Sequence, residues 1–167
     1  RSEQVVIAKH NGIAWVHVAQ AVPTNSTGAL YDQSLCAFRH LQGMLEGAGA
    51  HFQQVIRTWL YLGGIVAEEG PTQRYKELNR ARTDFYENLT FLDDRVPASY
   101  AGTVVPASTG IGTEGRGISM SAIALVTDRD DIIAMPLENP RQIAAYDYAE
   151  CYSPQSPKFC RAMALSC

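Results

Sequence analysis

The sequence predicts an α/β fold of the sandwich type, in which a mixed sheet carries two helices on one face. Stretches rich in β-branched and aromatic residues predict the strands, and two stretches with apolar residues at helical spacing predict the helices. Their order along the chain is β-β-α-β-α-β. An apolar fraction of 46% and a length of 167 residues fit one packed domain with a short additional segment.

The first elements are a hairpin and a helix. Residues 5–9 and 13–18 are rich in strand formers, and Asn11-Gly12 between them is a favoured two-residue hairpin turn. After a polar loop, apolar residues recur at helical spacing over residues 35–48, and a glycine follows as a stop signal. One face of this amphipathic helix is expected to pack on the sheet.

A buried strand and a second helix come next. Residues 55–62 are almost wholly apolar or aromatic, as expected of a central strand that is covered on at least one face. After a loop, Pro71 suits a first helical turn, and apolar residues at helical spacing extend to Leu89. Both helices are expected on the same side of the sheet.

The last third of the chain is poorer in regular patterns. Two prolines and five glycines lie within residues 93–117, so this stretch is expected to be irregular. Residues 118–126 predict a strand, and residues 132–135 are expected to extend the sheet. Residues 136–157 are expected to form an irregular connector.

Composition excludes several classes of function. The net charge is −3, and no run of like charge indicates a surface for nucleic acid. No apolar stretch approaches the ~20 residues that span a bilayer, and the N-terminus lacks the pattern of a signal peptide. The four cysteines and four histidines show no zinc-ligand spacing. We therefore expect no metal, no cofactor and no membrane contact, and reduced thiols in a cytoplasm.

Residues 110–115 match the dinucleotide-binding pattern GxGxxG. That pattern requires a strand before it and a helix after it, but the residues that follow alternate like a strand. A glycine-rich turn beside a pocket is therefore the preferred interpretation. Ser108, Thr109 and Arg116 flank these glycines, and backbone N–H groups near a guanidinium can hold a carboxylate. A solvated turn with a surface arginine is the alternative.

Arginines occur in two further settings. Arg57 lies inside an apolar strand, where it must reach a carboxylate, a ligand or the solvent edge, because an unpaired buried charge is costly. Arg74, Arg80 and Arg82 lie on the second helix beside acidic residues, at spacings that suit surface ion pairs. We therefore expect these three arginines on a solvated face.

The helix that ends in Ala48-Gly49-Ala50 and the strand Val55-Ile56-Arg57-Thr58-Trp59-Leu60-Tyr61-Leu62 resemble the RidA (YjgF) family. That family's pattern is a helix ending in Ala-Gly, followed by a strand of the type Val-Val-Lys-Thr-Thr-Val-Phe-Leu. Tyr75 and Asn79 resemble residues of the family's next helix. The resemblance implies a RidA-like sandwich that assembles as a homotrimer, with pockets between subunits.

This resemblance covers residues 3–126 and also implies an activity. RidA enzymes hydrolyse reactive enamines and imines, and an Arg just after a Pro-Ala pair grips the substrate carboxylate. Here the pair is Pro106-Ala107, and Ser108 stands at the position of the Arg. An imine deaminase is therefore an alternative function that lacks its carboxylate-binding residue.

Three later segments, residues 106–112, 138–142 and 152–162, resemble chorismatase-like proteins of the FkbO type. Those proteins join a degenerate RidA-like half to a second half. The resemblance implies that residues 1–135 are the first half. Residues 136–167 would be a connector and the start of a truncated second half.

Chorismatases cleave the enolpyruvyl ether of chorismate and release pyruvate, and their catalytic acid comes from the second half. No catalytic residue is therefore assigned in this chain. The resemblance implies a small carboxylate substrate, and its candidate ligands here are Arg161, Ser108, Thr109, Gly110, Arg116 and Tyr152. An ion pair with Glu138 or Asp147 is the alternative role of Arg161. A non-catalytic ligand-binding or scaffold domain also stays open.

Overall fold

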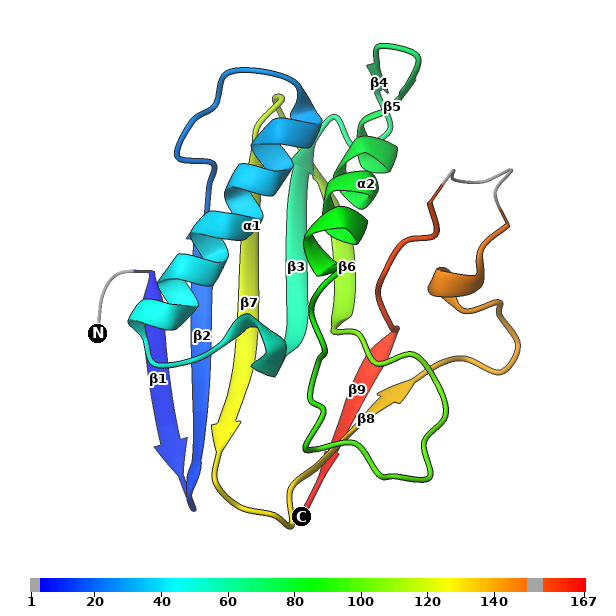
Figure 1. Ribbon diagram of the computed structural model, residues 1–167. Coiled ribbons are helices and arrows are strands. Elements are labelled where there is room, and N and C mark those ends of the chain that lie inside the picture. The colour runs from blue at the N-terminus through cyan, green and yellow to red at the C-terminus, as the bar shows by residue number, and fades with distance from the viewer. Residues whose placement is uncertain (1–3, 150–154) are drawn as a thin grey trace.

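A five-stranded mixed sheet carries both long helices on one face, as the sequence predicts (Figure 1). The computed structural model describes residues 4–149 and 155–167. The helices are α1, Leu30–Gly47, and α2, Arg74–Tyr86. The strands of the sheet are β1 Val5–His10, β2 Ile13–Ala21, β3 Val55–Gly63, β6 Ala107–Thr113 and β7 Ile118–Thr127. Their order is β1-β2-β7-β3-β6, and the predicted α/β sandwich is confirmed.

The N-terminal hairpin forms because its turn accepts left-handed backbone. Asn11 and Gly12 have φ values of 47° and 76°, which lie in the region that favoured two-residue hairpin turns require. β1 pairs with β2 along its whole length, and β2 pairs with β7 on its other side. The predicted hairpin is confirmed, and β1 forms one edge of the sheet.

Alternation along β3 separates the two faces of the sheet. Thr58, Leu60 and Leu62 are fully buried on the helix side, whereas Trp59 and Tyr61 are half-buried on the opposite face, which we name the open face. β3 pairs with β7 on one side and in parallel with β6 on the other, so it is an internal strand. The space below the helices is filled by an aromatic cluster of Phe38, Phe52, Phe85, Tyr86 and Phe91, with Phe52 in the short 3₁₀ helix Phe52–Gln54.

The edge strand β6 contradicts the expectation of an irregular stretch before residue 118. Its two glycines suggest a turn in the sequence, but in the structure they leave room for the side chains that cover the strand. A Cβ at Gly110 would lie 2.9 Å from Tyr75, and a Cβ at Gly112 would lie 2.9 Å from Ile65. The glycines therefore permit close packing on an edge strand.

The segment before α2 also corrects an expectation. Pro71 does not begin the helix but lies in the turn between two short strands, β4 (Glu68–Glu69) and β5 (Thr72–Gln73). Proline fixes φ at a value that suits a tight turn as well as a helix start, so the two alternatives look alike in a sequence. The helix begins three residues after Pro71 and ends three residues before Leu89.

Residues 132–135 do not extend the main sheet. β8, Ile133–Leu137, pairs antiparallel with β9, Ala162–Ser166, in a separate two-stranded ribbon beside β6 (Figure 1). A bridge between Ala107 and Cys160 links the start of β6 to the residues before β9. The connector between the two ribbon strands contains a short 3₁₀ helix, Ala145–Asp147, so it is not wholly irregular. The predicted boundary between residues 135 and 136 lies inside β8.

Candidate functional site

Ser108 and Thr109, two of the predicted ligands, occupy opposite faces at the start of β6. Ser108 lies on the helix side, where its Oγ accepts hydrogen bonds from the Thr58 hydroxyl at 2.8 Å and from an Arg82 Nη at 3.2 Å. Thr109 lies on the open face, and its Oγ1 accepts a hydrogen bond from an Arg57 Nη at 2.5 Å. Arginine thus reaches both residues, one from each side of the sheet.

Arg161 lies beside this start of β6 and is held by a carboxylate. Its backbone N–H donates to Glu138 Oε1 at 3.0 Å, and its Nε lies 3.3 Å from Glu138 Oε2. One Nη donates to the Ile143 carbonyl at 3.1 Å and contacts the Tyr148 hydroxyl at 3.4 Å. The ion pair with Glu138, one of the two alternatives from the sequence, is therefore present. The side chain still exposes 29% of its surface.

Arg57, Arg82 and Arg161, which we name the arginine cluster, give this region an excess of positive charge. Arg57 lies near Arg161, because one of its Nη atoms is 3.5 Å from the Arg161 carbonyl oxygen. It also bonds Thr109, which neighbours Ser108, the residue that Arg82 contacts from the other face. Within residues 4–149 and 155–167, Glu138 is the carboxylate that forms an ion pair with the cluster. Arg82 is buried on the helix side and Arg57 lies on the open face, so the partly exposed Arg161 is the member of the cluster that a further anion can reach.

Burial decides the state of Arg82. Its side chain is 1% exposed, so the expectation that it lies on a solvated face is wrong. Burial lowers the pKa of Arg82, but a guanidinium keeps its proton in proteins. Burial likewise raises the pKa of Tyr86, one turn further along α2, to about 12, so this phenol is neutral at physiological pH. Arg82 therefore stays charged although it is buried.

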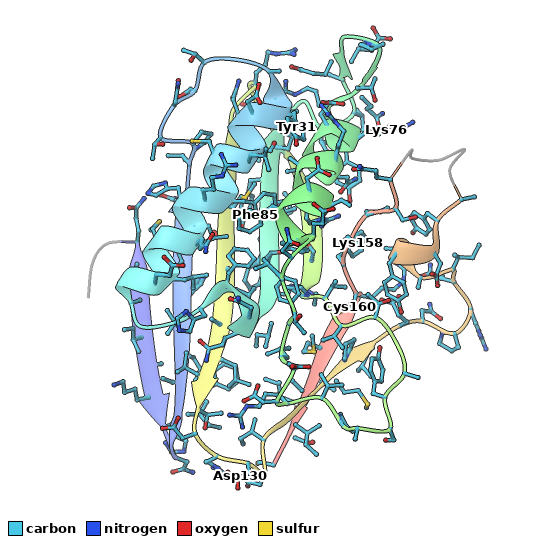
Figure 2. All side chains as sticks on the ribbon, in the orientation of Figure 1. Tyr31, Lys76, Phe85, Asp130, Lys158 and Cys160 are labelled. Atoms are coloured by element: carbon cyan, nitrogen blue, oxygen red, sulfur yellow. The ribbon has the colours of Figure 1, made fainter. Side chains whose placement is uncertain are left out.

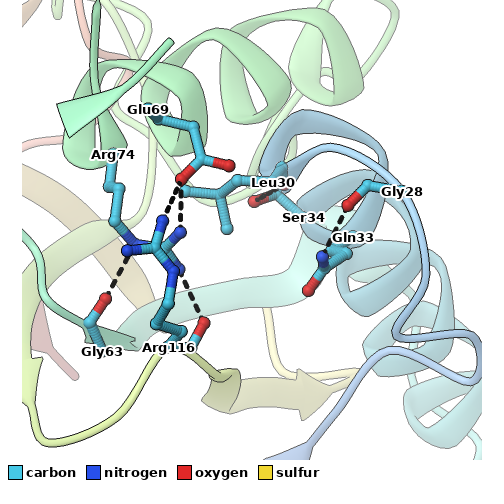
Figure 3. Close-up of polar contacts among 8 residues, drawn as sticks. All are labelled: Gly28, Leu30, Gln33, Ser34, Gly63, Glu69, Arg74 and Arg116. Atoms are coloured by element: carbon cyan, nitrogen blue, oxygen red, sulfur yellow. Dashed lines mark hydrogen bonds and ion pairs between the residues drawn. The ribbon is translucent and has the colours of Figure 1, made fainter.

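Arg116 belongs to a different group at the far end of β6 (Figure 3). Arg74 is 3% exposed and donates to the Gly63 carbonyl at 2.8 Å, to the Arg116 carbonyl at 2.6 Å and to Glu69 at 2.5 Å. The Arg116 guanidinium, 66% exposed, also pairs with Glu69 at 2.9 Å. These contacts fasten the loop after β6 to the end of β3, and the expectation of a solvated Arg74 is wrong.

The remaining predicted ligands do not gather at one point. Gly110 lies in the middle of β6 under the ring of Tyr75. Tyr152 lies outside the described residues. The structure thus brings Ser108, Thr109 and Arg161 together and separates Arg116 from them.

A hollow of about 500 Å³ lies on the open face and was not foreseen from the sequence. Gln20 at its rim has a φ of 56°, which is strained for a residue with a side chain, and it lies where the pairing of β2 and β7 shifts register. Strained bulges of this kind are frequent beside binding sites. The hollow combines aromatic walls with hydroxyl groups, and its lining is His17, Ala19, Gln20, Trp59, Tyr61, Ser119 and Ser121. Strand alternation alone would have placed most of them on one face.

Residues 4–149 and 155–167 contain neither a group of metal ligands nor a membrane-spanning helix. No three His, Cys, Asp or Glu side chains are grouped as the ligands of a metal ion would be. No helix is long and apolar enough to cross a membrane.

The sequence places this fold within a known family. Residues 1–124 match the family model described as chorismatase FkbO/Hyg5-like, N-terminal. The chain belongs to this family. A 3-hydroxybenzoate synthase of Streptomyces hygroscopicus is 29% identical over 94% of the chain, and a chorismatase of the same species is 27% identical over 91%. This FkbO/Hyg5-like domain spans 43% and 41% of those two relatives, which is less than half of either.

Solved structures show the same fold. A crystal structure of a chorismatase superposes on the FkbO/Hyg5-like domain with a TM-score of 0.68 at 22% identity, over 99% of this chain and 45% of that one. The YjgF gene product of E. coli superposes with a TM-score of 0.51 at 15% identity, over 75% of this chain and 87% of that one. The expected resemblance to RidA/YjgF proteins, and to FkbO-type proteins in particular, is confirmed. The chain is a chorismatase-like N-terminal domain.

Proposed function

We propose that this domain is the N-terminal half of an enzyme that cleaves the enolpyruvyl ether of chorismate and releases pyruvate. The description of the family and the name of the chorismatase relative support the reaction. Arg161 supports the substrate, because chorismate is a dicarboxylate and a guanidinium can bind a carboxylate through two parallel hydrogen bonds. The Arg161 side chain, which stays 29% exposed although Glu138 pairs with it, is the observation that carries the proposal.

In this proposal the two halves divide the chemistry. A carboxylic acid protonates the methylene of the enol ether, water adds to the oxocarbenium carbon, and the hemiketal breaks into pyruvate and a ring alcohol. The acid belongs to the second half. This chain supplies Arg161 as a ligand of one substrate carboxylate, with Glu138 orienting the guanidinium.

The proposal implies an enzyme in which a second half follows this chain, and we call that enzyme the longer protein. We expect the longer protein to release pyruvate from chorismate. The 167-residue chain alone should release none above the rate without protein. The reason is that binding groups without the acid cannot protonate the enol ether. Pyruvate is followed by coupling to lactate dehydrogenase, and circular dichroism confirms that the chain alone is folded. Turnover by the chain alone would contradict the assignment of the acid to the second half.

Assembly through the open face is part of the same proposal, with a homotrimer as the expected state. Trp15, Trp59 and Tyr61 are half-buried there although no layer covers them in the described structure. Aromatic side chains of this kind are typical of interfaces. Multi-angle light scattering of the longer protein should give the mass of a trimer, and replacing Trp59 with glutamate should shift it towards the monomer. A monomer for the unmodified protein would contradict this assembly.

A cytoplasmic location completes the proposal. Among the described residues, Cys36, Cys160 and Cys167 are free thiols. Free thiols persist in a reducing compartment, whereas secreted proteins tend to pair them.

A further inference from the structure

Arg82 is a buried cation without a carboxylate partner. It is 1% exposed, and no carboxylate of residues 4–149 or 155–167 forms an ion pair with it. One Nη donates to Asn79 Oδ1 at 2.6 Å and the other to Ser108 Oγ at 3.2 Å, while Nε finds no hydrogen-bond partner in the described part of the chain. Burying a charge in this way is costly, and an apolar residue of similar volume often gives equal or greater stability. The fold alone therefore does not explain an arginine here.

The guanidinium stands where three parts of the chain meet. Asn79 lies on α2, Ser108 lies on β6, and Phe159 lies on the segment formed by residues 155–161. The Phe159 ring lies 4.8 Å from the Arg82 guanidinium carbon, which is the geometry of a cation–π contact. Such contacts strengthen as the groups lose contact with water; here the guanidinium is buried and the Phe159 ring is partly buried.

Other contacts hold this segment on both sides of Phe159. Before it, the Thr83 hydroxyl donates to the Ser156 carbonyl at 3.3 Å. After it, Cys160 exchanges backbone hydrogen bonds of 3.2 Å with Pro106 and Ser108 (Figure 2 labels Lys158 and Cys160 on this stretch). The contact of Phe159 with Arg82 therefore adds a link to α2 directly before the residue that bonds to β6.

Arg161 follows directly, so its position depends on the same anchors. Its backbone carbonyl lies 3.5 Å from Arg57, and its guanidinium lies against Glu138. A shift of Phe159 away from α2 would carry Arg161 away from Ser108 and Thr109.

We propose that Arg82 is a positioning residue, whose cation–π contact with Phe159 holds residues 155–161 against α2 and so fixes Arg161 at the start of β6. Arg82 touches no substrate in this arrangement. The part that concerns substrate rests on the proposed function, whereas the holding of the segment does not.

The substitutions Arg82→Met and Phe159→Leu separate this role from simple packing. Methionine keeps much of the volume of Arg82 but removes the charge, so the melting temperature should stay the same or rise. The contact with Phe159 is lost in both variants, so backbone amide hydrogen exchange should become at least tenfold faster at Cys160 and Arg161, whose N–H groups donate to Pro106 and Glu138. Arg80→Met is the matched control, because Arg80 lies on the same helix but its side chain is 47% exposed. It should leave these amides within about twofold of the unmodified chain.

Hydrogen exchange tests whether Arg82 holds the segment, and the KM for chorismate tests whether that segment positions a substrate ligand. Unchanged exchange at Cys160 and Arg161 in both variants would overturn the role of Arg82, and so would faster exchange that merely follows a lower melting temperature across the whole domain. In the longer protein, Arg82→Met should raise the KM for chorismate about tenfold and leave kcat within about twofold. Faster exchange with an unchanged KM would retain Arg82 as the anchor of the segment and refute the link from Arg161 to substrate.

Discussion

Replacing Gly63 with alanine is expected to lower the free energy of unfolding by about 3 kcal/mol. A Cβ at this position would lie 2.5 Å from the Gly115 carbonyl oxygen and 2.8 Å from the Arg116 backbone nitrogen. Backbone atoms cannot move aside as a flexible side chain can, so the loop after β6 would have to leave the end of β3. That movement would also disturb the hydrogen bond from Arg74 to the Gly63 carbonyl. Urea denaturation of the 167-residue chain measures the change.

A second glycine provides the matched control. Gly43 lies on the exposed side of α1, and a Cβ there would meet nothing within 4 Å. Gly43→Ala should stabilise the chain by roughly 0.5–1 kcal/mol, because alanine loses less backbone entropy than glycine in a helix. If Gly63→Ala lowers the free energy of unfolding by less than about 1 kcal/mol, the loop after β6 does not pack against Gly63 as described.

Replacing Arg161 with lysine in the longer protein is expected to reduce pyruvate release from chorismate tenfold or more, about 1.4 kcal/mol in transition-state stabilisation. Lysine keeps the charge and can still pair with Glu138, so the melting temperature should stay the same. It cannot hold a carboxylate through two parallel hydrogen bonds, which is why turnover should fall. The coupled assay and differential scanning calorimetry report the two quantities.

Arg141→Lys is the control for this substitution. Arg141 lies on the same connector, but it is exposed and forms no ion pair within the described part of the chain. Turnover should therefore stay within about twofold. Unchanged turnover in Arg161→Lys, or a loss of stability with full turnover per folded molecule, would assign Arg161 to structure through its pair with Glu138.

Periodicity was sufficient to predict most of the fold. The hairpin, both helices and the strands β3 and β7 follow from residue spacing and turn chemistry that act over a few neighbouring positions. β6 could not be found in this way, because Gly110 and Gly112 lack the side chains by which a strand is recognised. Glycine is needed at these positions because the side chains of Tyr75 and Ile65, which are distant in sequence, pack directly against the strand.

The candidate site could be predicted only in part, for a similar reason. Arg161, Ser108 and Thr109 were named from the sequence, and the structure places them together at the start of β6. Arg82 was expected on the surface because acidic neighbours at helical spacing usually indicate exposed ion pairs. Its burial depends on which face of α2 meets β6 and Phe159, and local spacing does not contain that information.

The proposed cleavage of chorismate is tested most directly by offering the longer protein two substrates side by side, chorismate and an imino acid formed from an amino acid. We expect one pyruvate for each chorismate consumed. We expect no increase in the rate of ammonia release from the imino acid, because the resemblance of the sequence to RidA enzymes implies that Ser108 replaces their carboxylate-binding Arg. Accelerated ammonia release without consumption of chorismate would contradict the account and favour an imine deaminase. Activity on neither substrate would leave the domain as a binding or scaffold unit, and the chorismatase proposal would fall.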